Sequence, residues 1–187
     1  GANFGQNVGE ATLHVSGTVG AALHAAAQGL PALAVSIAID VAEREQGFPS
    51  TMAAFGPAAV MVRDLVEALD AADGTLRVPA GHVLNVNVPV PFDAVRGVRW
   101  ARPAAESGFE FRWRDPGGVL EAGEGALEIT FAPRLGFVPE SGTDVAELAG
   151  GYVTLTLLDG DPAIPPGRVP ALRGLASQAR SEGAPGP

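Results

Sequence analysis

GANFGQNVGEATLHVSGTVGAALHAAAQGLPALAVS, residues 1–36, decides the fold of this chain. It opens on a loop rich in glycine and asparagine, and Ser16-Gly17-Thr18 then caps a predicted helix that runs to about Gln28. Gly29-Leu30-Pro31 ends that helix, and the apolar run Leu33–Ile39 is typical of a strand buried on both faces. A loop, a helix and a buried strand in this order predict an α/β domain.

The chain continues this alternation to about residue 102. A second helix is predicted over about Ser50–Ala72, with Ser50 as its cap and an interruption near its start at Gly56-Pro57. Strands are predicted at Val83–Val88 and Val95–Ala101. Because helices between successive strands imply parallel pairing and right-handed crossovers, we expect a three-layer α/β/α, Rossmann-like core with a mostly parallel sheet.

Residues 103–142 break the alternation and predict a β-hairpin arm that projects from the core of residues 1–102. The arm contains two aromatic or apolar stretches, Phe109–Trp113 and Leu127–Phe131, separated by an Asp-Pro-Gly-Gly turn and an acidic, glycine-rich link. The aromatic residues of the first stretch alternate along the strand, which places them on one face. An exposed face of this kind favours a contact between subunits.

The rest of the chain divides at about residue 158. A short helix that begins at Thr143-Asp144 and a strand at Gly151–Leu158 (residues 143–158 together) are expected to complete one domain over residues 1–158. Residues 159–187 are rich in proline, glycine and alanine. This composition predicts a mobile tail.

Composition and charge exclude several classes of protein. The 12 basic residues, all arginine, are outnumbered by 21 acidic residues, and the net charge of −9 argues against a nucleic-acid duplex as partner. The chain has no cysteine, which excludes disulfides, thiolate metal sites and thiol catalysis. No apolar run reaches the length of about 18 residues that predicts a membrane span. The N-terminus lacks the basic segment of a secretory signal, so we expect a cytoplasmic location.

Asn3, Gly5, Asn7 and Gly9 occupy every second position of the opening loop. Asparagine carbonyls bind hard cations, asparagine amides donate to phosphate oxygens, and glycines let a ligand approach the backbone. Ser16-Gly17-Thr18 follows at a helix start, where free N–H groups and the helix dipole attract an anion. The combination suits phosphate-ester chemistry. A helix cap and tight turns alone would use the same residue types.

Three adjoining motifs of this stretch, GxNxGxNxG, SGTVGAA and GxPALAVS, resemble the SurE family of survival-protein phosphatases, which are metal-dependent 5'/3'-nucleotidases. Two later stretches agree in order: LNVNVP at Leu84–Pro89, and GTD at Gly142–Asp144 followed by GYVTLTLL. The resemblance implies a phosphomonoesterase that hydrolyses nucleoside 5'- or 3'-monophosphates with one divalent metal ion, Mg²⁺ or Mn²⁺. It also implies a homodimer or homotetramer, assembled through extended hairpins and C-terminal elements.

The resemblance assigns roles to residues of the opening stretch. Asn3 matches the asparagine that binds the metal, and Asn7 matches a second active-site asparagine with a catalytic role. Ser16, Gly17 and Thr18 match the segment that lines the phosphate pocket, to which Gly5 also contributes. Ser16 and Thr18 are further expected to take part in catalysis through their hydroxyl groups.

One departure from the family is large. The family holds its metal mainly through two adjacent aspartates after its first strand, and this sequence contains no adjacent Asp pair. We therefore hypothesise that the chain is the C-terminal part of a SurE-like enzyme whose first βαβ portion is absent. The alternative is a noncatalytic fragment that binds phosphate or self-associates. A dinucleotide-binding protein fits less well, because the spacing of Gly5 and Gly9 does not give GxGxxG.

For several other polar residues, a functional and a structural interpretation are both open. Asp40 and Ser36 lie at or near the carboxyl end of a predicted strand, where α/β proteins bind ligands, although a loop cap explains Asp40 as well. Asn85 and Asn87 alternate along one face of their strand, which favours a structural role. Thr143-Asp144 is expected to be a helix cap first and a functional pair second.

Overall fold

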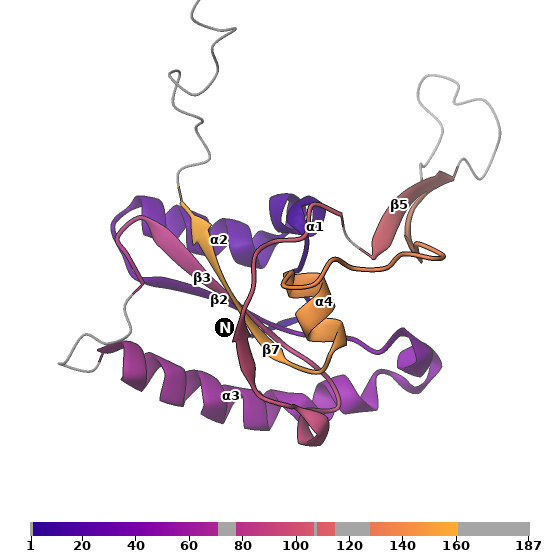
Figure 1. Ribbon diagram of the computed structural model, residues 1–187, viewed down its shortest axis with the longest axis horizontal. Coiled ribbons are helices and arrows are strands. Elements are labelled where there is room, and N and C mark those ends of the chain that lie inside the picture. Colours follow the sequence, from indigo (N-terminus) through magenta and orange to yellow (C-terminus); the bar gives the residue numbers. More distant parts are fainter. Residues whose placement is uncertain (1, 71–77, 107, 115–127, 161–187) are drawn as a thin grey trace, which may run out of the picture.

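The computed structural model describes residues 2–70, 78–106, 108–114 and 128–160. Within these ranges the chain forms a five-stranded sheet in the order β1-β2-β3-β7-β4 and a separate pair, β5-β6 (Figure 1). The strands are β1 Ala2–Phe4, β2 Ala32–Ile37, β3 His82–Val88, β4 Val98–Trp100, β5 Phe109–Arg114, β6 Glu128–Pro133 and β7 Val153–Asp159. The helices are α1 Glu10–Val15, α2 Gly17–Ala27, α3 Pro49–Asp70 and α4 Asp144–Ala149, with short 3₁₀ turns at Val41–Gln46 and Phe92–Ala94.

The large sheet is mostly parallel, as the alternation of elements predicts. β1, β2 and β3 run in one direction because α2 and α3 return the chain to the starting edge after β1 and β2. β7 pairs antiparallel with β3, and β4 pairs parallel with β7 at the edge of the sheet. The sheet therefore consists of three parallel strands followed by two that run the opposite way.

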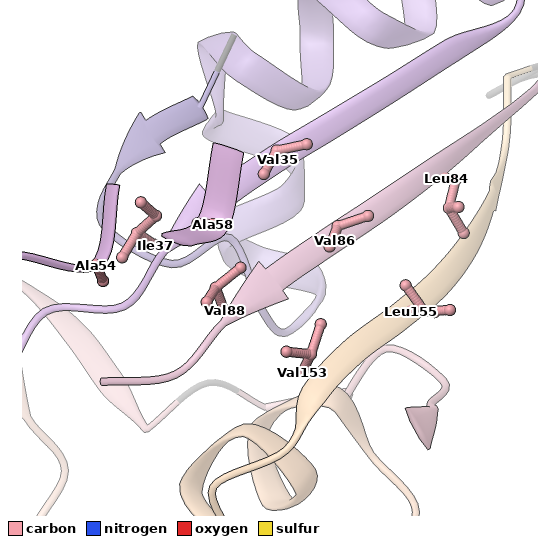
Figure 2. Packing of buried hydrophobic residues seen from close by; sticks show 9 residues of the cluster. All are labelled: Val35, Ile37, Ala54, Ala58, Leu84, Val86, Val88, Val153 and Leu155. Atoms are coloured by element: carbon pink, nitrogen blue, oxygen red, sulfur yellow. The ribbon is translucent and has the colours of Figure 1, made fainter. Parts of the chain in front are cut away.

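Helices α2 and α3 cover opposite faces of the sheet, which confirms the three-layer architecture (Figure 1). Alternate residues of a strand point to opposite faces, so Val83 packs with α2 whereas Leu84, Val86 and Val88 pack on the α3 side. Figure 2 shows the buried cluster on the α3 side, in which small α3 residues lie close to the valines of the sheet. Its buried members are Val35, Ile37, Ala54, Ala58, Leu84, Val86, Val88, Val153 and Leu155.

Three local expectations are corrected. The opening residues begin as a strand, not a loop, because Ala2–Phe4 pairs with Val35–Ile37 of β2; three residues carry too little periodicity to reveal this. A short helix, α1, precedes α2. Pro57 lies inside an unbroken α3. Pro57 and Ala53 both face solvent, where water can satisfy the carbonyl that proline cannot reach.

The predicted hairpin arm is present as the antiparallel pair β5-β6, whose register sets Phe111 opposite Phe131. The side chains of residues 110–114 and 128–133 and the turn at residues 115–127 lie outside the described residues, so the predicted subunit contact stays a prediction. β7 extends to Asp159, one residue into the predicted tail. Residues 161–187 lie outside the described residues.

Candidate functional site

The carboxyl ends of β1, β2 and β3 share one edge of the sheet, because the three strands are parallel. Residues 5–9 follow β1 at this edge, residues 38–40 follow β2, and Pro89 follows β3. Helix α2 runs back from this edge, since it joins β1 to the start of β2. Open α/β sheets bind their ligands outside the carboxyl ends of their strands. This edge is therefore the candidate site.

A row of polar residues crosses the sheet next to this edge. Asn3 of β1 is the register partner of Ser36 in β2, Ser36 that of Asn87 in β3, and Asn87 that of Thr154 in β7. Residues paired in register point to the same face, here the face that α2 covers. Ser36, Asn87 and Thr154 are fully buried. Buried polar groups on this face need hydrogen-bond partners, and the opening loop supplies several of them.

Asn7 is the centre of that hydrogen-bond network. Its Nδ2 donates to Ser36 Oγ over 2.6 Å, and its backbone N–H donates to Asn87 Oδ1 over 2.7 Å. Its backbone carbonyl accepts from Asn85 Nδ2 at 2.9 Å and from Asn87 Nδ2 at 3.1 Å. Asn7 is only 5% exposed. The structural role expected for Asn85 and Asn87 is thus present: both fix the loop that carries Asn7.

Asp144 fixes the far end of the same loop. Its Oδ2 accepts from the backbone N–H of Gly9 at 3.0 Å, and its Oδ1 accepts from Ala104 at 2.9 Å and from Val145 at 2.8 Å. Burial raises the pKa of the Asp144 carboxyl, and the backbone N–H groups offset part of this rise. The sequence indicated a cap here, and Thr143 is indeed the cap of α4, since its Oγ1 accepts from Ala146 N–H. The long-range role of Asp144 had no signal in the sequence beyond the GTD motif.

Ser16, Gly17 and Thr18 form the start of α2. Ser16 is its N-cap and accepts from the backbone N–H of Val19 at 3.1 Å. A hydroxyl that accepts in this way still has a proton to donate. Among the described residues, the backbone N–H groups of Gly17 and Thr18 and the Thr18 hydroxyl have no hydrogen-bond partner. These donors stand at the positive end of the helix dipole, which suits an anion.

The side-chain oxygen of Asn3 has no hydrogen-bond partner among the described residues. Its Nδ2 donates to the carbonyl of Gly5 at 3.0 Å, and no described residue donates to its Oδ1. Gly5 has a φ of 98°, which favours glycine at that turn. In the part of the chain that the structure describes, no group of three or more His, Asp or Glu side chains could hold a metal ion. Asn3 thus offers one neutral ligand, without the carboxylates that Mg²⁺ prefers.

The structure brings the predicted residues together only in part. Hydrogen bonds link Asn7 to Ser36, and the register places Asn3 beside Ser36. No hydrogen bond between described residues joins Ser16 or Thr18 to Asn3 or Asn7. The metal, phosphate and catalytic roles expected for these residues stay predictions.

A search of the helices in the described ranges finds none whose length and hydropathy would allow it to span a membrane.

The fold and this edge define an α/β protein with a candidate ligand site outside the ends of its parallel strands. A family model described as survival protein SurE matches residues 1–109, which is more than half of the chain. The chain belongs to the SurE family. This confirms the resemblance carried by the opening motifs.

Two curated relatives agree with this family assignment. The chain is 34% identical to the 5'-nucleotidase SurE of Gemmatimonas aurantiaca, over 84% of this chain and 57% of the relative. It is 38% identical to the 5'-nucleotidase SurE of a Synechococcus strain, over 84% of this chain and 54% of the relative. The chain therefore spans about half the length of these relatives.

A solved structure has the same fold. The crystal structure of the SurE protein from Aquifex aeolicus superposes with a TM-score of 0.64 at 24% identity. The match covers 94% of this chain and 63% of that protein. At this identity the likeness establishes the α/β fold alone.

Proposed function

We propose that this chain supplies the phosphate-binding side of a nucleotidase site, which hydrolyses the phosphate ester of a nucleoside monophosphate. The match of the SurE family model to residues 1–109 carries the proposal. That range contains both the loop after β1 and the first turn of α2. The name 5'-nucleotidase, which both curated relatives bear, supports a 5'-monophosphate as the substrate.

The donors at the start of α2 would bind the phosphoryl group. The N–H groups of Gly17 and Thr18 and the Thr18 hydroxyl have no other partner among the described residues, and the Ser16 hydroxyl retains its proton. Donors fixed by a helix cost little reorganisation when negative charge develops on the phosphoryl oxygens. Asn7 would contribute by holding the loop in place through Ser36 and Asn87.

The proposal includes a divalent metal ion, Mg²⁺ or Mn²⁺, only if further ligands complete its site. Asn3 Oδ1 is free to bind one. Two carboxylates at this edge already accept backbone hydrogen bonds: Asp144 accepts three, and Asp40 accepts one as the cap of the 3₁₀ turn that follows it. Among the described residues, no group of three or more acidic or histidine side chains could hold a metal ion. The described residues therefore do not fit a complete metal site, and the carboxylates would have to come from elsewhere.

Phosphate release from adenosine 5'-monophosphate, with Mg²⁺ or Mn²⁺ present, tests the proposal. The chain alone and a fusion that carries the N-terminal part of the Gemmatimonas aurantiaca relative ahead of residue 1 are compared. We expect activity in the fusion and none in the chain alone. Activity of the chain alone would contradict the need for added carboxylates. An inactive fusion that is folded and binds metal would contradict the nucleotidase assignment.

The lack of a carboxylate cluster among the described residues also favours a second candidate, a chain that binds phosphate without hydrolysis. Titration with inorganic phosphate distinguishes the two. Binding that depends on Thr18, together with an inactive fusion, would support this second function.

A further inference from the structure

Helix α1 joins the two parts of the candidate site, the loop that carries Asn7 and the first turn of α2. It follows its N-cap, Gly9, and ends at Ser16, which is both the C-cap of α1 and the N-cap of α2. None of its six residues is buried, and a helix of this length has little stability of its own. The position of the donors at Ser16–Thr18 therefore depends on what holds the start of α1.

Two backbone hydrogen bonds to groups outside the helix hold that start. The N–H of Gly9 donates to Asp144 Oδ2 at 3.0 Å, and the N–H of Glu10 donates to the carbonyl of Ala104 at 2.8 Å. Such bonds satisfy N–H groups that have no partner within the first turn of a helix. The N–H of Ala104 in turn donates to Asp144 Oδ1 at 2.9 Å. Both bonds therefore lead back to one carboxylate, that of Asp144.

Asp144 is itself fixed in the protein. Its side chain is fully buried, and its backbone N–H donates to the carbonyl of Arg102 at 2.8 Å. Leu148, one turn further along α4, belongs with Val8 of the opening loop to one buried cluster. Helix α4 thus supports the loop at two successive residues, through this cluster at Val8 and through Asp144 at Gly9. Because close-packed interiors transmit strain, a change in one of these contacts is expected to move its neighbours.

We propose that Asp144 is a positioning residue for the nucleotidase reaction: it holds the start of α1 and thereby places the donors at Ser16–Thr18 relative to Asn7. The inference rests on the proposed function, because these donors are the ones assigned there to the phosphoryl group. Asp144 touches neither the phosphate nor a metal ion in this role. A displacement of about 1 Å in the groups that bind the reacting atoms can slow a reaction about a hundredfold.

Asp144→Asn and Asp144→Glu change the anchor of α1 and leave the donors of α2 chemically unaltered. The amide offers one oxygen to three backbone N–H groups, and the longer glutamate keeps the charge but displaces the anchor. Glu147→Gln is the matched control, because it makes the same chemical change one turn further along α4. The Glu147 carboxylate bonds to Arg99 and to the N–H of Gly142, which lie outside the loop and α1.

Titration of the 187-residue chain with inorganic phosphate tests this role without catalysis. The amide resonances of Gly17 and Thr18, followed by NMR, report binding at the start of α2. We expect Asp144→Asn to raise the Kd for phosphate by at least about threefold and Glu147→Gln to leave it unchanged. Circular dichroism establishes that each variant is folded; if Asp144→Asn is not, Asp144→Glu decides.

Hydrolysis by the fusion gives a second readout, the rate per folded molecule. After correction for the folded fraction, Asp144→Asn should lower kcat/KM for adenosine 5'-monophosphate by at least about tenfold, and Glu147→Gln by less than about twofold. If Asp144 had only a structural role, its replacement would lower the folded fraction and leave the corrected rate and the phosphate Kd unchanged. That result would overturn the proposal.

The two proposals fail separately. An active fusion whose corrected kcat/KM is unchanged in Asp144→Asn keeps the nucleotidase and overturns the role of Asp144. An inactive fusion that is folded and binds metal removes the nucleotidase. If phosphate affinity of the chain then falls in Asp144→Asn but not in Glu147→Gln, Asp144 still positions the anion site. Equal losses in these two variants would assign the effect to α4 as a whole and overturn the role of Asp144.

Discussion

Asp144 Oδ2 accepts a 3.0 Å hydrogen bond from the backbone N–H of Gly9, a residue 135 positions away in the sequence. The same carboxylate holds Ala104 at the root of the arm and Val145 in the first turn of α4. One buried side chain thus joins the loop of the candidate site, the arm and the last helix. This junction fixes where the loop after β1 ends and α1 begins.

Replacing Asp144 with asparagine is expected to lower the free energy of unfolding by about 1–3 kcal/mol. An amide presents one oxygen, so its NH₂ group would face at least one of the three backbone donors. Urea unfolding followed by circular dichroism measures the change. Asp64→Asn is the control, because Asp64 lies in an exposed pair with Arg63 and should change the free energy by less than about 1 kcal/mol.

The raised pKa of Asp144 gives a pH dependence with a definite sign. The folded state holds this proton more tightly than the unfolded state, whose pKa is near 3.8. The contribution to stability is therefore complete below that value and is lost as the pH rises through the folded pKa. The stability advantage of the parent chain over Asp144→Asn should shrink as the pH rises above 3.8 and through the folded pKa. An advantage that grows with pH would show that the backbone donors outweigh burial.

Thr156 provides a test of the buried polar face. Its Oγ1 is buried and has no hydrogen-bond partner among the described residues, as is also true of Thr154 Oγ1 and Asn85 Oδ1. Valine has the same shape without the hydroxyl, so Thr156→Val should stabilise the protein by about 1 kcal/mol. Thermal unfolding of this variant beside the parent measures it. A clear drop in Tm would mean that the hydroxyl has a partner.

Substitutions at Ser16 and Thr18 distinguish an effect on folding stability from an effect on phosphate binding. Ser16→Ala removes the cap of α2 and should cost about 1 kcal/mol of stability, whereas Ser16→Asp should retain most of it. Thr18→Val removes only a hydroxyl without a described partner, so stability should hold while phosphate affinity falls. Calorimetric unfolding and titration with inorganic phosphate give the two readouts. Equal phosphate affinity in Thr18→Val would exclude Thr18 from the anion site.

The sequence predicts those parts of the fold whose signals are local. Ser16 before an alanine-rich helix and the apolar run at Leu33–Ile39 fall close to α2 and β2. The position of β7 between β3 and β4 depends on pairing between distant segments, so no local pattern indicates it. The same holds in the site. Motifs single out Asn3 and Asn7, but the contacts that hold Asn7 join residues far apart in the chain.

The last prediction concerns Asn3 as a ligand of the divalent metal ion. Its Oδ1 is free while its Nδ2 is bound to the Gly5 carbonyl, so the amide is already oriented. In the active fusion, Asn3→Ala should raise the Mg²⁺ concentration for half-maximal phosphate release by about tenfold or more. Asn3→Asp keeps an oxygen at the same place and should restore much of the metal affinity, although it loses the hydrogen bond to Gly5. Because loss of that hydrogen bond alone would affect both variants, a rise confined to Asn3→Ala identifies the oxygen as a ligand. An unchanged Mg²⁺ requirement in Asn3→Ala would remove Asn3 from the metal site.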